Sequence, residues 1–250
     1  MKALVTGGAG FIGSNIVAQM RHEGHEVVVL DNLLSGYRIN LEPLDGVRCI
    51  EGDVRDPRAV DEAMAGSEVV FHLAASVGNK RSIEQPLIDA EINVLGTLQI
   101  LEGARRHGLR KVVTSSSAGI FGELKQLPIS EDHPVEPDSP YGCTKLCEEK
   151  LCLAYSRLYE LEAVCLRYFN VYGPNQRFDA YGNVIPIFVF QMLRGQTLTI
   201  FGDGEHTRDF VNVHDVVQAS PKAAKGRSTR GTGESLTEYL AWAREEVARG

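Results

Sequence analysis

Short apolar runs alternate with segments of helical periodicity over the first 168 residues. The apolar runs lie at residues 3–5, 26–30, 47–50, 68–72, 111–114 and 163–168. Between them, apolar positions repeat every three to four residues, as in helices with one buried face, at residues 11–20, 57–64, 86–107 and 141–159. Strands that alternate with helices favour a parallel sheet covered on both faces. The pattern therefore predicts an α/β fold, which right-handed crossovers would make doubly wound.

The alternation stops after Tyr168. Residues 169–183 are typical of a loop, residues 184–193 of a helix, residues 198–201 of a short strand, and residues 207–217 of a strand that turns into a helix. We expect residues 1–167 to form one domain and residues 168–250 a smaller lobe that closes over the sheet. Residues 220–233 are polar and contain glycine, which predicts a flexible linker, and residues 234–249 predict an amphipathic helix.

Composition places the chain among ordinary globular proteins. Its 250 residues suffice for one α/β unit, and a hydrophobic fraction of 43% and a charged fraction of 24% are typical. A net charge of −7 disfavours nucleic acid as a partner. No apolar run approaches the ~20 residues of a membrane helix, and Met1 leads straight into the first strand without a signal peptide. Five cysteines without metal-type spacing predict no metal site and a reducing, cytoplasmic setting.

The first predicted strand runs into a glycine-rich turn that opens the first helix. Gly7, Gly10 and Gly13 are spaced by three residues, and Phe11 and Ile12 start the helix. In a dinucleotide-binding turn, the first glycine permits a tight turn, the second permits close approach of a pyrophosphate, and the third lets the helix pack on the strand. The helix N-terminus would offer free N–H groups to the phosphates. The spacing alone also fits a plain strand–helix turn.

The end of the second predicted strand strengthens the dinucleotide interpretation. Asp31 follows Gly13 by 18 residues, and an acidic residue there accepts hydrogen bonds from the adenosine ribose and repels a 2′-phosphate. The sequence therefore predicts NAD rather than NADP. Asp53, after the third strand, could reach an adenine amino group or serve as a helix N-cap or a turn aspartate. The small residues within 73–76 would let a backbone lie against the cofactor.

Tyr141 and Lys145 give the strongest chemical signal. At i and i+4 they share one face of the predicted helix 141–159. The preceding strand ends in Ser115, Ser116 and Ser117, where a bound nicotinamide would lie. A phenol with an ordinary pKa of ~10 is a weak base at neutral pH, but a nearby ammonium and a positive nicotinamide favour the phenolate. The pattern predicts a general base, although a surface lysine and an interfacial tyrosine would share the spacing.

The motifs taken together resemble the extended short-chain dehydrogenase/reductase family. In order, they are TGGAGFIG, DNLLSG, GDVRD, HLAA, SSSAGIFG, SPYGCTK, LRYFNVYGP and GDGEHTRDFVNVHDVV. Within that family, residues 1–219 are most similar to the NAD-dependent nucleotide-sugar epimerases of the UDP-glucose 4-epimerase type. The resemblance implies a Rossmann-type doubly wound parallel sheet with a smaller substrate lobe. It also implies one tightly bound NAD that is recycled, a UDP-sugar substrate and a homodimer.

The resemblance further implies a role for each candidate site residue. Tyr141 would be the base, Lys145 would hold the nicotinamide ribose, and Ser117 would hydrogen-bond the reacting hydroxyl. The guanidinium fork of Arg208 suits a diphosphate, although a pair with Asp209 is the alternative. The expected substrate contacts are Ser117, Asn170, Asn183, Phe201 and Arg208. The expected NAD contacts are Gly7, Gly10, Phe11, Ile12, Gly13, Asp31, Asn32, Leu33, Ser35, Gly36, Asp53, Val54, Leu73, Ala74, Ala75, Asn93, Ser115, Tyr141, Lys145 and Tyr168.

Several alternatives share this fold. The resemblance does not separate the UDP-glucose series from UDP-N-acetylhexosamines or UDP-uronates. A nucleotide-sugar 4,6-dehydratase would carry an acidic pair directly after the hydroxyl residue, whereas Ala118, Gly119 and Ile120 follow Ser117 here. A non-catalytic NAD-binding protein is the alternative outside enzymes, and the intact Ser117, Tyr141 and Lys145 weigh against it. After about residue 219 the lobe is shorter than the family pattern, which predicts weakened sugar binding.

Overall fold

A six-stranded parallel sheet forms the centre of the molecule. The computed structural model describes residues 1–178 and 183–226. The strands of the sheet are β1 (Lys2–Thr6), β2 (Glu26–Asp31), β3 (Val47–Glu51), β4 (Val69–His72), β5 (Lys111–Ser117) and β6 (Glu162–Tyr168). Their order is β3-β2-β1-β4-β5-β6, and every neighbouring pair is parallel. This is the doubly wound order that the alternation of strands and helices predicted, with the strand order reversing between β1 and β4.

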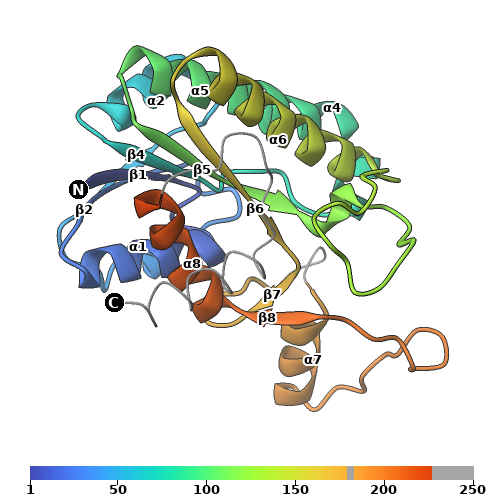
Figure 1. Cartoon of the computed structure of the whole chain (residues 1–250). Coiled ribbons are helices and arrows are strands. Elements are labelled where there is room, and N and C mark those ends of the chain that lie inside the picture. Colours follow the sequence, from blue (N-terminus) through green and yellow to red (C-terminus); the bar gives the residue numbers. More distant parts are fainter. Residues whose placement is uncertain (179–182, 227–250) are drawn as a thin grey trace, which may run out of the picture.

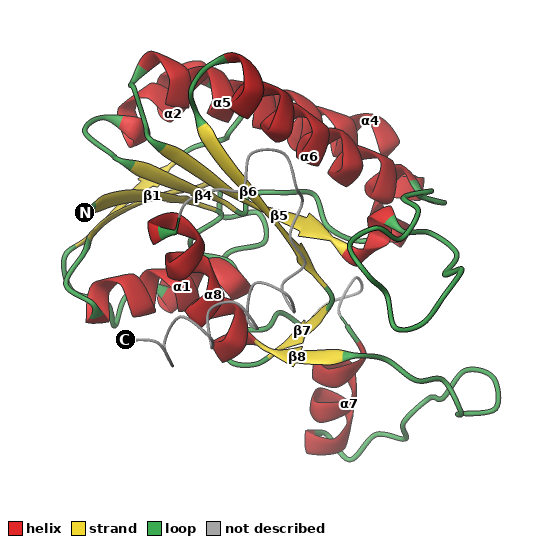
Figure 2. Cartoon of the chain, in the orientation of Figure 1, coloured by secondary structure: helices red, strands yellow, loops and turns green. Residues whose placement is uncertain are grey.

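Helices cover both faces of the sheet (Figure 1). One face carries α1 (Phe11–His22) and α8 (Val213–Lys225), which pack on each other. The other face carries α2 (Pro57–Met64), α3 (Asn79–Glu84), α4 (Pro86–Ala90), α5 (Gly96–Arg106) and α6 (Pro140–Leu158). Short 3-10 turns lie at η1 (Arg38–Asn40) and η3 (Ala118–Ile120). Figure 2 shows the resulting three layers of helix, sheet and helix.

The two-sided burial explains why the strands are apolar throughout rather than alternating with polar residues. Successive side chains of a strand point to opposite faces of the sheet. In β1, Val5 belongs to the core under α1 and α8, whereas Leu4 belongs to the core under α2, α5 and α6. Val29 and Val28 of β2 divide in the same way. Each strand therefore contributes to two cores, and a near-continuous apolar run is what a sheet covered on both faces requires.

The helical region predicted at residues 86–107 is continuous but changes pitch in the middle. Between α4 and α5 lies a π-helical turn, η2 (Glu91–Leu95). Asn93 is the buried residue of that turn. Such turns occur where a helix must redirect a side chain. Apolar periodicity predicted the helix but carried no signal for the π turn, because the inserted residue changes hydrogen bonding and leaves the composition unchanged.

The smaller lobe differs from its prediction in two places. A two-stranded parallel ribbon joins β7 (Asn170–Tyr172) to β8 (Phe210–Asn212), and α7 (Val184–Leu193) lies beyond it. The loop expected at residues 169–174 is therefore wrong for the three residues of β7. The strand expected at residues 198–201 is also wrong, because β7 pairs with β8 instead and Phe201 is 83% exposed. A strand needs a partner, and the sequence of one strand does not name it.

The polar linker expected from residue 220 is wrong over its first part, because α8 continues to Lys225. Ser220 is buried and donates its hydroxyl to the carbonyl of Val216 at 2.9 Å. At the helix end, the buried ammonium of Lys111 donates to the carbonyl of Ala223 at 3.0 Å. These bonds bring a polar-looking segment against the sheet. The amphipathic helix predicted at residues 234–249 lies outside the described residues.

Candidate active site

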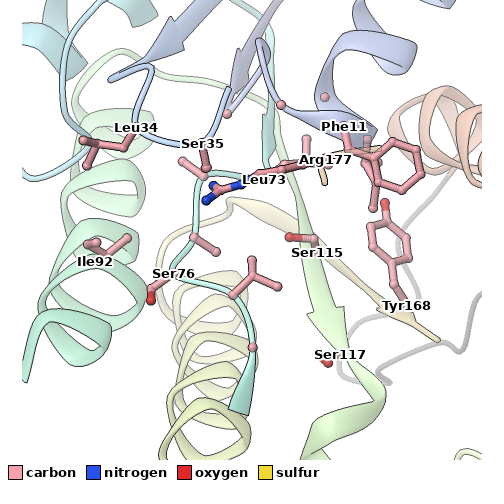
Figure 3. Close-up of a pocket in the computed structure, with 18 of the residues that line it drawn as sticks. Phe11, Leu34, Ser35, Leu73, Ser76, Ile92, Ser115, Ser117, Tyr168 and Arg177 are labelled. Atoms are coloured by element: carbon pink, nitrogen blue, oxygen red, sulfur yellow. The ribbon is translucent and has the colours of Figure 1, made fainter. Parts of the chain in front are cut away.

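A cavity of about 360 Å³ opens at the carboxyl ends of the strands. The turn after β1, the ends of β2, β4, β5 and β6, and the start of α6 all contribute residues to it. Figure 3 shows side chains from these separate segments pointing into the same space. The cavity spans the point between β1 and β4 where the strand order reverses. Ligands of open α/β sheets usually bind at this point.

The glycine turn after β1 is shaped by close backbone contacts. Gly7 has a positive φ of +68°, and a Cβ there would lie 2.8 Å from the amide nitrogen of Ala74. A Cβ on Gly13 would lie 2.1 Å from the carbonyl oxygen of Gly7. Side chains at these two positions would therefore separate α1 from the turn. Glycine is required at both for the physical reasons that the motif predicted.

The N-terminus of α1 faces the cavity without a side-chain cap. Its N-cap residue is Gly10, which has no side chain to accept a hydrogen bond. By contrast, Asp56, Ser139 and Asn212 cap α2, α6 and α8 with side-chain oxygens. Uncapped N–H groups and the positive end of the helix dipole form an anion site. This end of the cavity fits a pyrophosphate.

Asp31 ends β2 and lines the cavity. Its two carboxylate oxygens accept hydrogen bonds from the amides of Ala9 at 2.9 Å and Leu33 at 2.8 Å. Burial raises the pKa of Asp31, while the two amides act to lower it. The carboxylate is thus fixed between the glycine turn and its own loop, as a ribose-binding acid must be.

Four of the expected NAD contacts do not line the cavity: Leu33, Gly36, Asp53 and Asn93. The Asp53 carboxylate accepts from the guanidinium of Arg55 at 2.8 and 2.9 Å, and this bond holds the pKa of Asp53 well below its usual range. Asp56 rather than Asp53 caps α2. The turn alternative for Asp53 is confirmed, because its carboxylate accepts a hydrogen bond from the amide of Arg55 at 2.9 Å. Gly36 packs against Ala9, and Leu33 packs against the core.

Asn93 supports the cavity wall from behind. Its side-chain oxygen accepts from the amide of Ser76 at 2.8 Å, and its nitrogen donates to the carbonyl of Ser76 at 3.0 Å. The same nitrogen lies 3.1 Å from the hydroxyl of Thr144 on α6. Ser76 lines the cavity. The π turn therefore orients a side chain that ties the β4 loop to the helix of Tyr141.

Ser117, Tyr141 and Lys145 lie together at the end of the cavity formed by β5 and α6. Burial raises the pKa of Tyr141 above its ordinary value, although the charge of Lys145 and the hydroxyl of Ser117 act to lower it. Burial opposes the charge of Lys145, but a carboxylate on the same helix outweighs it and the pKa of Lys145 is raised. Lys145 is 2% exposed and is therefore a buried cation beside a phenol.

Tyr168 shows what the same burial does to a phenol without a cation. It ends β6, lines the cavity and shares a hydrogen bond of 3.3 Å with Ser220. Burial raises the pKa of Tyr168 to about 12. Of these two phenols, only Tyr141 has an ammonium charge that favours its ionised form.

The expected substrate residues are only partly brought together. Asn183 lines the main cavity and also a neighbouring cavity of about 240 Å³, whose wall includes Asn170 and Arg208. Gln176 lines both cavities too, so the two adjoin. The guanidinium of Arg208 donates to the carbonyl of Thr207 at 2.7 Å. Phe201 is 83% exposed and lines neither cavity.

Several cavity residues were not identified from the sequence. Most of them lie in loops or at strand ends, where no periodic pattern marks them, and two lie in helical turns: Leu30, Leu34, Gly52, Val77, Gly78, Arg81, Ile92, Phe169, Val171, Gln176 and Arg177. The side chain of Arg177 reaches the main cavity from the segment after β7 and lies near Ser35 and Leu73 in Figure 3. No cluster of metal-binding side chains occurs within residues 1–178 and 183–226. None of the helices described there is long and apolar enough to cross a membrane.

Comparison with known proteins identifies the family. The model of the NAD dependent epimerase/dehydratase family matches residues 3–236. The UDP-glucose 4-epimerase of Mycolicibacterium smegmatis is 42% identical over 256 residues, covering 96% of this chain and 80% of that protein. The chain therefore belongs to the NAD-dependent epimerase/dehydratase family. It is an enzyme of that family, and its cofactor is NAD.

Solved structures agree with this assignment. The UDP-glucose 4-epimerase of Thermotoga maritima, determined with UDP-glucose, has a TM-score of 0.86 and 40% identity over 89% of this chain and 73% of that one. A dTDP-glucose 4,6-dehydratase of Streptomyces venezuelae, determined with NAD, has a TM-score of 0.87 and 32% identity over 99% of this chain and 81% of that one. The fold is thus the Rossmann-type fold of these enzymes, and the chain spans roughly three quarters of their length.

Proposed function

We propose that this chain is an NAD-dependent UDP-sugar 4-epimerase that interconverts UDP-glucose and UDP-galactose. The observation that carries the proposal is the placement of Ser117, Tyr141 and Lys145 at one end of a cavity whose other parts are the glycine turn and Asp31. Relatives named UDP-glucose 4-epimerase, at 42% and 40% identity, support the substrate class. When bound, NAD supplies the nicotinamide that accepts the hydrogen from sugar C4 and returns it.

The roles of the side chains follow from their chemistry. We infer that Tyr141 removes the proton of the sugar 4-hydroxyl and later returns a proton to the ketone oxygen, once hydride has been added to the other face of C4. Ser117 is placed to hydrogen-bond the same oxygen, and its hydroxyl already accepts from the amide of Gly119 at 3.1 Å. Lys145 favours the phenolate by its charge. General acid–base catalysis of this kind contributes about 10²–10⁴-fold to the rate.

The arrangement disfavours dehydration, although a relative of this fold is a dehydratase. Removal of water from the neighbouring carbon requires an acid and a base in addition to Tyr141. Asp31 is the one carboxylate among the described residues that line the cavity, and it ends β2, three strands from β5. Glu123 lies beyond η3 with an 84% exposed side chain and pairs with Lys125. The segment after Ser117 therefore does not supply the acidic pair that a dehydratase would carry there.

An assay with purified UDP-sugars tests the proposal. We expect UDP-glucose and UDP-galactose to interconvert at high substrate concentration without consumption of NAD. Tyr141→Phe should reduce turnover by roughly 10²–10⁴-fold or more and leave NAD binding unchanged. Tyr155→Phe is the matched control, because Tyr155 lies on the same helix but outside the cavity, where it donates to Glu102 at 2.7 Å. Turnover of Tyr141→Phe within about threefold of the native rate would refute the assignment of the base.

The same assay decides between the alternatives. A panel that adds UDP-N-acetylglucosamine and UDP-glucuronate separates the epimerase series by relative kcat/KM. Formation of a 4-keto-6-deoxy sugar would indicate a dehydratase. Binding of NAD without conversion of any UDP-sugar would indicate a protein that only senses the cofactor.

A further inference from the structure

Lys145 has a buried anionic partner on its own helix. Its ammonium lies 2.5 Å from a carboxylate oxygen of Glu148, three residues further along α6. The side chains of both residues are only 2% exposed. The other oxygen of Glu148 accepts the hydroxyl of Thr114 from β5. Glu148 is therefore held from two sides, and it holds the lysine in turn.

The adjacent carboxylate, Glu149, belongs to a different pair. It accepts from the guanidinium of Arg167 at 2.7 and 3.2 Å and from the hydroxyl of Ser116 at 2.9 Å. Arg167 keeps its charge at any pH the fold survives. Arg167 of β6 thus neutralises the charge of Glu149. Glu148 remains as the counterion of Lys145.

The position of this pair matters because Lys145 also faces the phenol of Tyr141. We propose that Glu148 is a positioning residue: it holds the ammonium of Lys145 and limits how strongly that ammonium favours the phenolate of Tyr141. The proposal rests on the role proposed above for Tyr141 as the base. An ammonium that is already paired at 2.5 Å exerts a weaker field on a second anion than an unpaired one would.

Other charged groups around the site act in known directions. Glu148 and Asp89 both raise the pKa of Tyr141, in addition to its burial, while Lys145 lowers it. His72 of β4 is buried with its pKa lowered to about 3, so it carries no charge at neutral pH. Burial raises the pKa of Glu148 itself, whereas Lys145 and the hydroxyl of Thr114 act to lower it. Cys152 and Glu149 are further titratable groups that bear on the Lys145–Glu148 pair. Of these groups, Glu148 alone bonds the lysine directly.

Glu148→Gln removes the negative charge but keeps an oxygen that Lys145 and Thr114 can bond. The charge of Lys145 is then opposed mainly by the phenolate of Tyr141. We expect the pKa of Tyr141 in the NAD-bound enzyme to fall by about one pH unit, since an opposite charge within a few ångströms shifts a pKa by ~1–3. The acidic limb of the kcat profile should move to lower pH by the same amount.

The phenol is titrated by its ultraviolet phenolate absorbance in the NAD-bound protein. Each protein is compared with its own Tyr141→Phe derivative, so that the seven other tyrosines cancel. Glu148→Asp is the second variant; it keeps the charge but withdraws it from Lys145, and the pKa should fall by a smaller amount. Glu123→Gln is the control, because Glu123 pairs with Lys125 at 2.8 Å on the exposed surface, and no shift is expected.

The outcomes separate the possible roles of Glu148. A lowered pKa in Glu148→Gln, with Glu148→Asp between it and the native protein, supports the proposal. If the role of Glu148 is only structural, the variants should have a changed melting temperature and an unchanged pKa of Tyr141. That result would overturn the proposal. A raised pKa also overturns it, since Lys145 would then have lost its proton. Because the titration does not need turnover, it remains readable even if no UDP-sugar is converted.

Discussion

At the scale of single residues, we propose that Asp31 distinguishes NAD from NADP. Its carboxylate is fixed by the amides of Ala9 and Leu33 and lines the cavity. We expect Asp31→Ala to weaken NAD binding and to reduce the preference for NAD over NADP, because a hydrogen-bond acceptor for the ribose and a charge that repels the 2′-phosphate are removed together. Binding titrations with both dinucleotides measure the ratio.

Asp31→Asn separates the two effects of that substitution. The amide keeps one oxygen as a hydrogen-bond acceptor but removes the negative charge. The affinity for NADP should therefore rise by more than the affinity for NAD falls. A native protein that already prefers NADP would show that the interpretation of Asp31 is wrong.

His72 makes the stability of the protein depend on pH. It is 1% exposed and bonds Thr6 at 2.8 Å and Thr97 at 3.1 Å. Burial, aided by the charge of Lys145, lowers its pKa from 6.5 to about 3. Between these two pH values His72 binds a proton in the unfolded chain but not in the folded protein. The free energy of unfolding is therefore highest above pH 6.5 and decreases as the pH falls toward 3.

Urea unfolding at two pH values checks this expectation. The free energy of unfolding should fall by about 2 kcal/mol between pH 7 and pH 5 through His72 alone. His72→Gln, which keeps polar contacts to both threonines, should remove most of that slope. His22→Gln is the control on the exposed side of α1. An unchanged slope in His72→Gln would contradict the prediction.

At the scale of elements, the helices on one face of the sheet carry exposed apolar side chains. Leu87 of α4 is 78% exposed and Leu95 of η2 is 55% exposed, while Leu158 at the end of α6 is 69% exposed. These helices pack side by side. We propose that this face pairs with a second copy of the chain, as the family resemblance implied, because exposed apolar patches mark interaction surfaces.

Light scattering should then give the mass of a dimer at micromolar concentration. Leu87→Glu should produce a monomer, because it places a charge on the apolar face. Leu193→Glu on α7 is the matched control, since Leu193 is also 78% exposed but lies in the smaller lobe. A monomeric native protein, or dissociation by both substitutions, would argue against this face.

The elements of the sheet could be predicted from sequence because the burial of each strand and helix is visible in its own residues. The apolar run of β1 and the periodicity of α1 are local properties. β7 and β8 could not be predicted in the same way, since each has three residues and is defined by its pairing with the other. The end of α8 was missed because Lys111, which bonds its last turn, lies more than a hundred residues earlier.

The residues of the candidate site likewise fall into those that the local sequence predicts and those that only the folded structure reveals. The glycine turn, Asp31 and the Tyr141–Lys145 pair each follow the end of a predicted parallel strand, and this position, more than their spacing, predicted that they converge. Asn93 supports Ser76 from outside the cavity, and only the π turn explains that orientation. Glu148 was not singled out, because a glutamate after a helical lysine is ordinary until its burial is known.

At the scale of the whole molecule, the sheet and the smaller lobe contribute unequally. We propose that residues 1–167 hold NAD and that residues from 168 onward hold the sugar nucleotide. The division is not a clean cut, because α8 lies on the sheet against α1 although it follows the lobe in sequence. Two hydrogen bonds further tie the lobe to α1: Asn175 donates to the hydroxyl of Ser14 at 3.0 Å, and Asn15 donates to the carbonyl of Pro174 at 3.0 Å. Through these bonds the two binding regions share one helix.

This unequal contribution predicts a gap between two affinities. The main cavity, where we propose that NAD binds, is walled by the glycine turn and the ends of β2, β4, β5 and β6. The neighbouring cavity is smaller, and Phe201 stays exposed outside it. We expect isothermal titration of one sample to give a Kd for UDP at least about tenfold above that for NAD, a difference of ~1.4 kcal/mol or more. Turnover should accordingly be low at modest UDP-sugar concentration and rise in proportion to it, because weak binding raises KM while Tyr141 and Lys145 remain in place. Micromolar UDP binding together with rapid turnover at low substrate would show that Asn170, Asn183 and Arg208 suffice to hold the nucleotide sugar.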